Sequence, residues 1–275
     1  MIFCVSVEFC SNSDKQKIRY LCEKRNISPI KRQIASGKKA YTKRQETDNG
    51  SNAKQKEGVI VEKLHTRTVQ FSSNKFGNIV PIQAIPGHFV TSHSHVNYFI
   101  DLTMLKSSQE DAQKCAHALA SQYKDVDSID TIICLDGTGI IGAFLSVELQ
   151  KKIPASEHKK IYVICPECAN NGQMFFRENV EPMVCEKNVM LLMATVTTGI
   201  SIRRGMECIE YYGGNLKSVC TIFSAVDDVD GVTVHNIFTA DDIPGYASYQ
   251  RRDCPFCKNN TPIEALVNSY GYSQL

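Results

Sequence analysis

The stretch that decides the fold is Val189 to Ile202, VMLLMATVTTGISI, in which an apolar run leads into threonines, a glycine and a serine. A short apolar run of this kind is typical of a buried strand, and hydroxyl residues beside a glycine often begin a helix. The segment from Ile200 to Tyr212 is then expected to be that helix. The stretch therefore predicts a strand that ends in a tight turn and passes directly into a helix.

The same alternation of strand and helix continues outward along the chain. Further short apolar segments, expected to be strands, are 131–135 (TIICL), 161–164 (IYVI) and 217–223 (KSVCTIF). Helices are expected over 139–149 and over 109–123, where Ala112, Cys115, Ala116, Ala118 and Leu119 recur at helical spacing. This alternation predicts an α/β fold with a mostly parallel sheet flanked by helices.

Composition excludes several classes of protein. The 275 residues are 43% hydrophobic and 22% charged, which argues against a fibrous or wholly disordered chain. The longest apolar runs fall short of the roughly 18 to 20 residues that a membrane-spanning helix requires, and residues 1–9 lack the basic start of a secretion signal. Twelve cysteines without such a signal are interpreted as reduced thiols, so we expect a cytoplasmic location and no membrane partner.

Residues 1–57 form a basic leader that differs from the rest of the chain. They hold 13 Lys and Arg against 6 Asp and Glu, a charge of +7, whereas the remaining 18 against 23 give −5. The segment 36–56 contains no Leu, Ile, Val or Phe, so we expect it to be disordered. A nucleic-acid or acidic-partner arm is the alternative, but we favour a solvated tail and expect no nucleic-acid partner.

Two turns at the ends of strands have the composition of phosphate-binding loops. The first contains Asp136, Gly137, Thr138 and Gly139, and the second contains Thr195, Thr197, Thr198, Gly199 and Ser201. Glycines allow backbone N–H groups to approach an anion, and the following helix adds a favourable dipole. An ordinary turn and an ordinary Thr/Ser helix cap are the alternatives. Because both turns lie at the carboxyl ends of strands, a phosphorylated ligand is expected in the crevice there.

At these residues the chain resembles the type I phosphoribosyltransferases. The block 189–202 is similar to their phosphoribosyl-pyrophosphate motif, and LDGTG at 135–139 falls where they have a pyrophosphate loop. The segment 89–108, FVTSHSHVNYFIDLTMLKSS, resembles the amino-terminal substrate segment of orotate phosphoribosyltransferases. The similarity extends over roughly residues 86 to 245.

The resemblance implies a role for each of these segments. The loop from Thr195 to Ser201 would hold the 5′-phosphate of phosphoribosyl pyrophosphate, and the turn from Asp136 to Gly139 would hold the pyrophosphate with Mg²⁺. A nucleobase would lie near Ser92, Tyr98 and Phe99. We also expect a homodimer. The change after Gly58 to alternating apolar strands and amphipathic helices predicts one domain over 58–275, divided into a cap at 58–108, a core at 109–245 and a carboxyl-terminal extension at 246–275.

The chain departs from that family at two places. The two acids that bind the ribose hydroxyls in active relatives are replaced by Met193 and Ala194. The mobile catalytic loop of the family carries basic residues, whereas here Arg177 and Lys187 are the only cations in or beside the corresponding stretch, 165–186. Two hypotheses follow: a transferase acting on a pyrimidine-type base such as orotate, or a non-catalytic relative that senses a phosphoribosyl ligand or nucleotide.

Cysteine and histidine pairs raise a separate question about metals. Two CxxC pairs, Cys165 with Cys168 and Cys254 with Cys257, could together enclose a structural Zn²⁺, although two unrelated turns are favoured. Three histidines cluster in GHFVTSHSH, namely His88, His93 and His95. For these we favour solvent-facing or substrate-contacting roles over a metal site, because no further ligands can be named.

Overall fold

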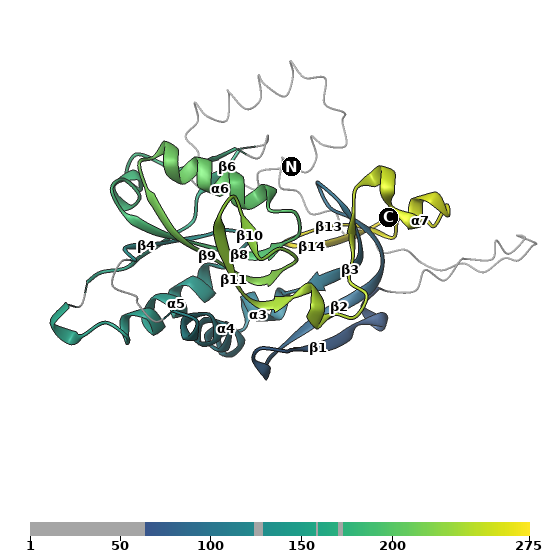
Figure 1. Cartoon of the computed structure of the whole chain (residues 1–275), viewed down its shortest axis with the longest axis horizontal. Helices are drawn as coiled ribbons and strands as arrows, with labels where there is room; N and C mark the ends of the chain where they lie inside the picture. Colours follow the sequence, from purple (N-terminus) through teal and green to yellow (C-terminus); the bar gives the residue numbers. More distant parts are fainter. Residues whose placement is uncertain (1–63, 124–128, 158, 170–172) are drawn as a thin grey trace, which may run out of the picture. The chain divides into compact units, whose positions relative to one another are not determined.

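The computed structural model describes residues 64–123, 129–157, 159–169 and 173–275 (Figure 1). The predicted basic leader lies outside these residues. The central sheet has the strand order β10-β11-β9-β8-β4-β5. Its strands are β4 (Thr131–Cys134), β5 (Tyr162–Ile164), β8 (Asn188–Val196), β9 (Asn215–Ser224), β10 (Asp228–Val229) and β11 (Val232–Thr239). All neighbours run parallel except the short β10–β11 hairpin.

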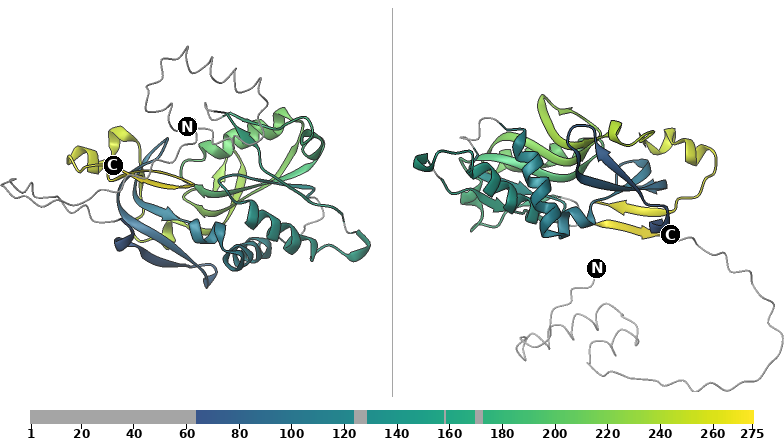
Figure 2. Two further views of the ribbon diagram at one scale, coloured as in Figure 1. Left: turned by 180° about the vertical axis from the view of Figure 1, so that it is seen from behind. Right: turned by 90° about the horizontal axis from the view of Figure 1, so that it is seen from below.

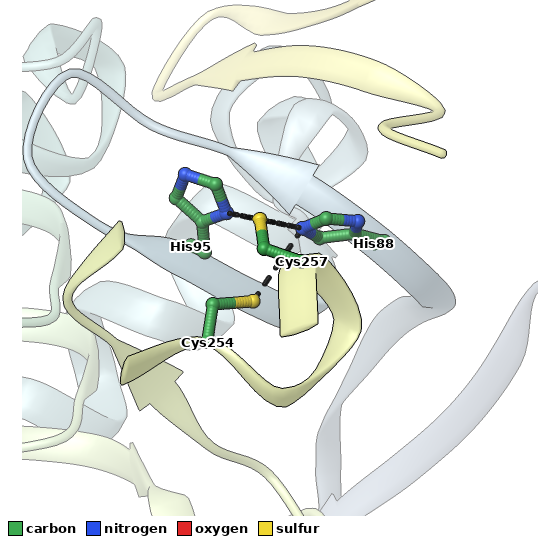
Figure 3. Close-up of side chains that lie close together, drawn as sticks. All are labelled: His88, His95, Cys254 and Cys257. Carbon is green, nitrogen blue, oxygen red and sulfur yellow. Dashed lines mark hydrogen bonds between the residues drawn. The ribbon is translucent and has the colours of Figure 1, made fainter. Parts of the chain in front are cut away.

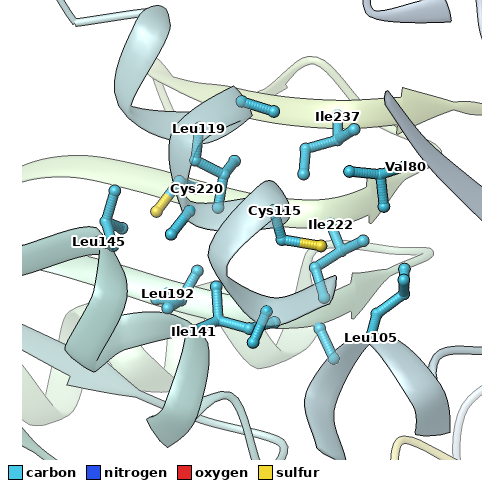
Figure 4. Packing of buried hydrophobic residues seen from close by; sticks show 14 of the residues in the cluster. Val80, Leu105, Cys115, Leu119, Ile141, Leu145, Leu192, Cys220, Ile222 and Ile237 are labelled. Carbon is cyan, nitrogen blue, oxygen red and sulfur yellow. The ribbon is translucent and has the colours of Figure 1, made fainter. Parts of the chain in front are cut away.

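Helices cover both faces of this sheet. One face is covered by α4 (Gln109–Ser121) and α5 (Gly139–Gln150), and the other by α6 (Ile200–Tyr211) (Figure 1). The larger hydrophobic cluster lies beneath α4 and α5, where Leu119, Leu145, Leu192 and Ile222 are fully buried (Figure 4). The predicted α/β architecture is confirmed, and β11 is a parallel strand that the sequence analysis did not predict.

A second sheet forms the cap. It contains β1 (Val69–Ser73), β2 (Gly77–Val90), β3 (His95–Asp101), β12 (Ser248–Tyr249), β13 (Ala265–Asn268) and β14 (Gly271–Gln274). The strand β13 pairs parallel with β2, so the carboxyl-terminal extension and the amino-terminal cap segment share one sheet (Figure 2). The helix α3 (Thr103–Ser107) follows β3, and α7 (Pro255–Lys258) lies between β12 and β13.

The third sheet of the described residues is a small hairpin. It pairs β6 (Glu167–Cys168) with β7 (Met174–Phe175). Within the described part of the chain, every helix is too short or too polar to cross a membrane.

Candidate phosphate and base site

A pocket of about 260 Å³ lies where the carboxyl end of β8 meets the cap sheet. Residues predicted from the sequence line it from both sides: Ser92, Tyr98, Phe99, Asp136, Thr195, Thr197, Thr198, Gly199 and Ser201. The structure therefore brings the second predicted phosphate loop, part of the first and the predicted base segment to one place.

The loop after β8 owes its shape to Gly199. This residue has φ of +76° and lies at the amino terminus of the twelve-residue helix α6. A Cβ atom at this position would lie 2.8 Å from a methyl group of Val229. A left-handed conformation combined with so close an approach requires glycine. The loop thus presents the amino terminus of α6, which favours an anion.

Asp136 is the acidic residue of the pocket among the described lining residues. It has φ of +57°, and its carboxylate accepts a hydrogen bond from the Ser269 hydroxyl at 2.9 Å. The Lys106 ammonium donates to the Asp136 carbonyl oxygen at 3.1 Å and thereby supports the turn. Burial raises the pKa of the Asp136 carboxyl above its ordinary value, although bonds from Ser269 and the Ala194 N–H oppose that rise.

The remaining residues of the first turn do not line the pocket. Thr138 is fully buried, and its hydroxyl donates to the carbonyl oxygens of Leu135 at 2.7 Å and Leu192 at 3.3 Å. Gly137 and Gly139 are also absent from the pocket wall. These three residues shape the turn that carries Asp136, and in this structure only Asp136 of the predicted four lies on the pocket surface.

The base side of the pocket comes from the cap. Ser92 is exposed in the loop between β2 and β3, whereas Phe99 is buried on β3. The Phe99 ring contacts Tyr272 edge-on, with centroids 5.5 Å apart, and Tyr98 packs edge-on against Phe71. These contacts fix two aromatic side chains beside one exposed hydroxyl.

Met193 and Ala194 have no exposed surface. Met193 belongs to the hydrophobic cluster beneath α6, and Ala194 to the cluster beneath α4 and α5. Neither side chain lines the pocket. A carboxylate at either position would be buried in an apolar environment, which disfavours its charged form.

Arg204 is the cation best placed to bind a phosphate, and the sequence did not predict it. Arg204 on α6 lines the pocket together with His93, and it is the only Lys or Arg among the described lining residues. Arg203 beside it forms a two-bond ion pair with Asp230, at 2.8 and 3.0 Å. The signal in the sequence is an arginine five residues after Gly199, in the first part of the helix that follows the glycine turn.

The two cations named from the sequence lie elsewhere. Arg177 is exposed and forms a two-bond pair with Glu167 at 2.8 and 2.7 Å. Lys187 immediately precedes β8, so the whole strand, roughly 25 Å long, separates it from the phosphate loop. In this structure neither residue lines the pocket.

The two CxxC pairs do not come together. The Cys134 thiol donates a hydrogen bond to Cys165, which lowers the Cys165 pKa to about 7, against an ordinary 9.0. Cys254 and Cys257 instead lie beside His88 and His95 in the cap. The four-cysteine grouping is therefore not formed, because one pair lies between the end of β5 and the β6–β7 hairpin, whereas α7 places the other pair in the cap.

The histidines also differ from expectation. His88 and His95 are 1% and 5% exposed, so the expectation that they face solvent or substrate is wrong. Their rings face each other because β2 and β3 are antiparallel neighbours. His93 is exposed in the connecting loop and lines the pocket.

The central parallel sheet, the glycine turn after β8 and the cap match the α/β architecture that the resemblance to type I phosphoribosyltransferases implies. No family model matches the chain. It is 26% identical over 183 residues to orotate phosphoribosyltransferase from Pelotomaculum thermopropionicum, covering 65% of this chain and 87% of the relative. It is 27% identical over 181 residues to orotate phosphoribosyltransferase from Thermotoga maritima, covering 65% and 88%. The resemblance to orotate phosphoribosyltransferases that the sequence motifs indicate is confirmed.

A comparison with solved structures gives weaker similarities. Orotate phosphoribosyltransferase from Aeropyrum pernix has a TM-score of 0.43 and 16% identity, covering 57% of this chain and 88% of that one. Orotate phosphoribosyltransferase from Mycobacterium tuberculosis, in complex with Fe(III) dicitrate, has a TM-score of 0.40 and 14% identity, covering 58% and 91%.

Proposed function

We propose that the pocket binds phosphoribosyl pyrophosphate and that the chain transfers its phosphoribosyl group to a pyrimidine-type base such as orotate. One observation carries the proposal: the glycine turn before α6 and the aromatic residues of the cap line the same pocket. The similarity to orotate phosphoribosyltransferases over 65% of the chain supports the same assignment.

The proposed phosphate subsite combines several weak donors with one cation. The hydroxyls of Thr197, Thr198 and Ser201 line the pocket next to the amino terminus of α6. Neutral donors directed at several oxygens, together with a helix terminus, suit a terminal phosphate. Arg204 would add a charge-assisted hydrogen bond, which is about twice as strong as a neutral one.

The proposed base subsite lies against β3. Tyr98 offers half-buried aromatic surface on which a planar base can pack, the buried Phe99 next to it closes the wall, and Ser92 offers a hydroxyl for the polar edge of the base. The base nitrogen would then attack C1 of the ribose as pyrophosphate leaves. Because positive charge develops on the ribose in such a transfer, the main contributions of the chain are positioning and charge stabilisation.

Mg²⁺ is part of the proposal, held chiefly by the ligand. Protein Mg²⁺ sites usually use one or two carboxylates together with substrate phosphates. Asp136 is the one carboxylate among the described lining residues, and Ser269 already donates to it. The residues fit a magnesium ion that enters with pyrophosphate and neutralises its charge, and Asp136 is the side chain that would face it.

A second function, ligand sensing without catalysis, is favoured by Met193 and Ala194. They replace the two family acids, and both are fully buried here. If each missing charge-assisted bond to the ribose is worth about 1.5 to 3 kcal/mol, the loss is about 3 to 6 kcal/mol. That loss corresponds to roughly two to four powers of ten in rate or affinity.

The deciding experiment measures binding and turnover with the full chain. Calorimetry with phosphoribosyl pyrophosphate and Mg²⁺ measures affinity, and a coupled assay measures pyrophosphate release with orotate, uracil and purine bases. Release with one base supports the transferase and names its substrate. Binding without release supports the sensor. Neither binding nor release would refute both functions.

We further propose that the chain acts as a homodimer, and that it is located in the cytosol because its cysteines are interpreted as reduced thiols. Light scattering coupled to size-exclusion chromatography tests the dimer, and a single-chain mass at working concentration would contradict it.

A further inference from the structure

Four potential metal ligands meet in the cap, outside the pocket just described. They are His88 on β2, His95 on β3, and Cys254 and Cys257 at the two ends of a CxxC turn. One ligand atom from each lies within 4.8 Å of all the others. Figure 3 shows the four side chains directed at one another. Among the described residues, this is the one group of three or more such side chains.

Three sulfur-to-nitrogen separations match the coordination shell of a single ion, and the nitrogen-to-nitrogen separation is slightly shorter. Tetrahedral Zn²⁺ with bonds of about 2.3 Å to sulfur and about 2.0 Å to nitrogen places ligand atoms about 3.3 to 3.8 Å apart. Here Cys254 Sγ and Cys257 Sγ lie 3.5 and 3.6 Å from His88 Nε2. Cys257 Sγ lies 3.4 Å from His95 Nδ1, and the two ring nitrogens are 3.0 Å apart.

The sulfur-to-nitrogen distances also favour one ion over a two-iron cluster. In clusters with two cysteines and two histidines, the histidines bind one iron and the cysteines bind the other. Such a cluster would move the sulfurs away from the ring nitrogens. Here both sulfurs lie as close to a histidine nitrogen as neighbouring ligands of one ion do.

Neighbouring groups orient His88 for this role. Its Nδ1 lies 3.0 Å from the carbonyl oxygen of Thr261 and 3.2 Å from that of Pro262, so Nδ1–H donates and the Nε2 lone pair faces the sulfurs. Metal-binding histidines characteristically donate their second N–H to a carbonyl or carboxylate. The Phe256 ring also stacks on His88, with centroids 5.2 Å apart and an angle of 20°.

Local backbone features place the ligands. The register of β2 and β3 shifts between Pro86 and Phe89, which rotates the intervening residues out of the regular ladder. A Cβ at Gly87 would lie 2.5 Å from a Glu264 oxygen and 2.7 Å from the Phe89 ring, so a larger residue here would require those side chains to shift. Glu264 in turn accepts from the His88 N–H at 3.0 Å and from Arg67. These hydrogen bonds hold the carboxyl-terminal segment beside the register shift between β2 and β3.

We propose that His88, His95, Cys254 and Cys257 bind one structural Zn²⁺. Two cysteines and two histidines are a common ligand set for structural zinc, and three of the four are buried, which leaves no open position for substrate. His88 and Cys254 are 166 residues apart, so the ion joins the β2–β3 hairpin to the carboxyl-terminal extension. The hairpin loop at 91–94, whose first three residues line the pocket, is held at its base by this ion.

The test measures metal in the full chain, expressed without a histidine tag and purified without chelator. Mass spectrometry of the metal content is expected to give about one zinc per chain. The variants Cys257→Ser and His95→Asn are expected to lose most of it. The matched control is Cys165→Ser with Cys168→Ser, which removes the other CxxC pair and is expected to retain full zinc.

A second measurement keeps the test decisive if those variants fail to fold. Wild-type chain loaded with Co²⁺ is expected to show the visible absorption of tetrahedral cobalt with thiolate ligands, and EDTA is expected to lower the melting temperature. Metal-free wild-type protein with an unchanged melting temperature in EDTA would overturn the proposal, leaving a hydrogen-bonded cluster. Zinc lost in the control variant but kept in Cys257→Ser would also overturn it.

Discussion

The carboxylate of Asp136 accepts a hydrogen bond from the hydroxyl of Ser269 at 2.9 Å, across 133 residues of sequence. Asp136 follows the core strand β4, and Ser269 lies in the turn of the β13–β14 hairpin of the cap. The bond therefore joins the core to the cap at the wall of the pocket. Lys106 reinforces it by donating to the carbonyl oxygens of both residues.

Ser269→Ala is expected to raise the pKa of the Asp136 carboxyl further. The Ser269 bond stabilises the ionised form, and burial already disfavours that form, so removing the bond shifts the balance toward the neutral acid. Carboxyl-carbon NMR of the Asp136 side chain over a pH titration measures the shift. Ser273→Ala on the exposed strand β14 is the matched control. An unchanged Asp136 titration in Ser269→Ala would show that the bond does not form in solution.

Gly199→Ala is expected to abolish binding of phosphoribosyl pyrophosphate. The new Cβ would adopt a left-handed conformation, which costs about 1 to 2 kcal/mol, and would also meet Val229 at 2.8 Å. Gly231→Ala is the matched control, because Gly231 has φ of +83° and open space around its Cβ position. Calorimetry measures the affinity of both variants for phosphoribosyl pyrophosphate, and Gly231→Ala is expected to bind like wild type because Gly231 lies in the β10–β11 hairpin. If Gly199→Ala binds phosphoribosyl pyrophosphate as tightly as Gly231→Ala does, the shape of the loop does not determine binding.

Arg204→Gln is expected to weaken binding of the phosphoribosyl ligand about 10- to 100-fold, because a hydrogen bond to a charged group is worth about 1.5 to 3 kcal/mol. Arg203→Gln is the neighbouring control. Arg203 is paired with Asp230 at the surface, and such exposed pairs contribute at most about 1 kcal/mol. Affinities that fall equally in both variants would place Arg204 outside the phosphate site.

Much of the fold could be predicted from the local pattern. The strands at 131–134 and 188–196 and the helix from Ile200 were expected from apolar runs and their caps. The cap sheet could not be predicted in full, because β13 pairs with β2 across most of the chain. Strand pairing of that kind depends on tertiary contacts that no local window contains.

The site residues also divide into those that a local pattern predicts and those that only tertiary contacts bring together. The hydroxyls and glycine of the loop from Thr195 to Ser201 could be predicted as candidate site residues because their pattern is local, and they line the pocket. The histidine–cysteine cluster could not be found, because His88 and Cys254 meet only after the cap sheet has formed. The sequence offered two CxxC pairs of equal appearance, and only folding showed that one of them faces two histidines.

Cys165 is expected to be an unusually reactive thiol near neutral pH. Its pKa is lowered to about 7 by the hydrogen bond from Cys134, so the thiolate is already half-formed there, whereas an ordinary thiol requires about pH 9. Because folding lowers this pKa, the thiolate contributes stability above the ordinary pKa of 9.0, and this stability is lost as the pH falls through about 7.

The rate of iodoacetamide labelling at Cys165, followed by peptide mass spectrometry, should rise with a midpoint near pH 7. Cys134→Ala removes the donor and should move that midpoint upward, while exposed Cys185 serves as the internal reference in both proteins. Identical midpoints in wild type and Cys134→Ala would show that Cys134 does not activate Cys165.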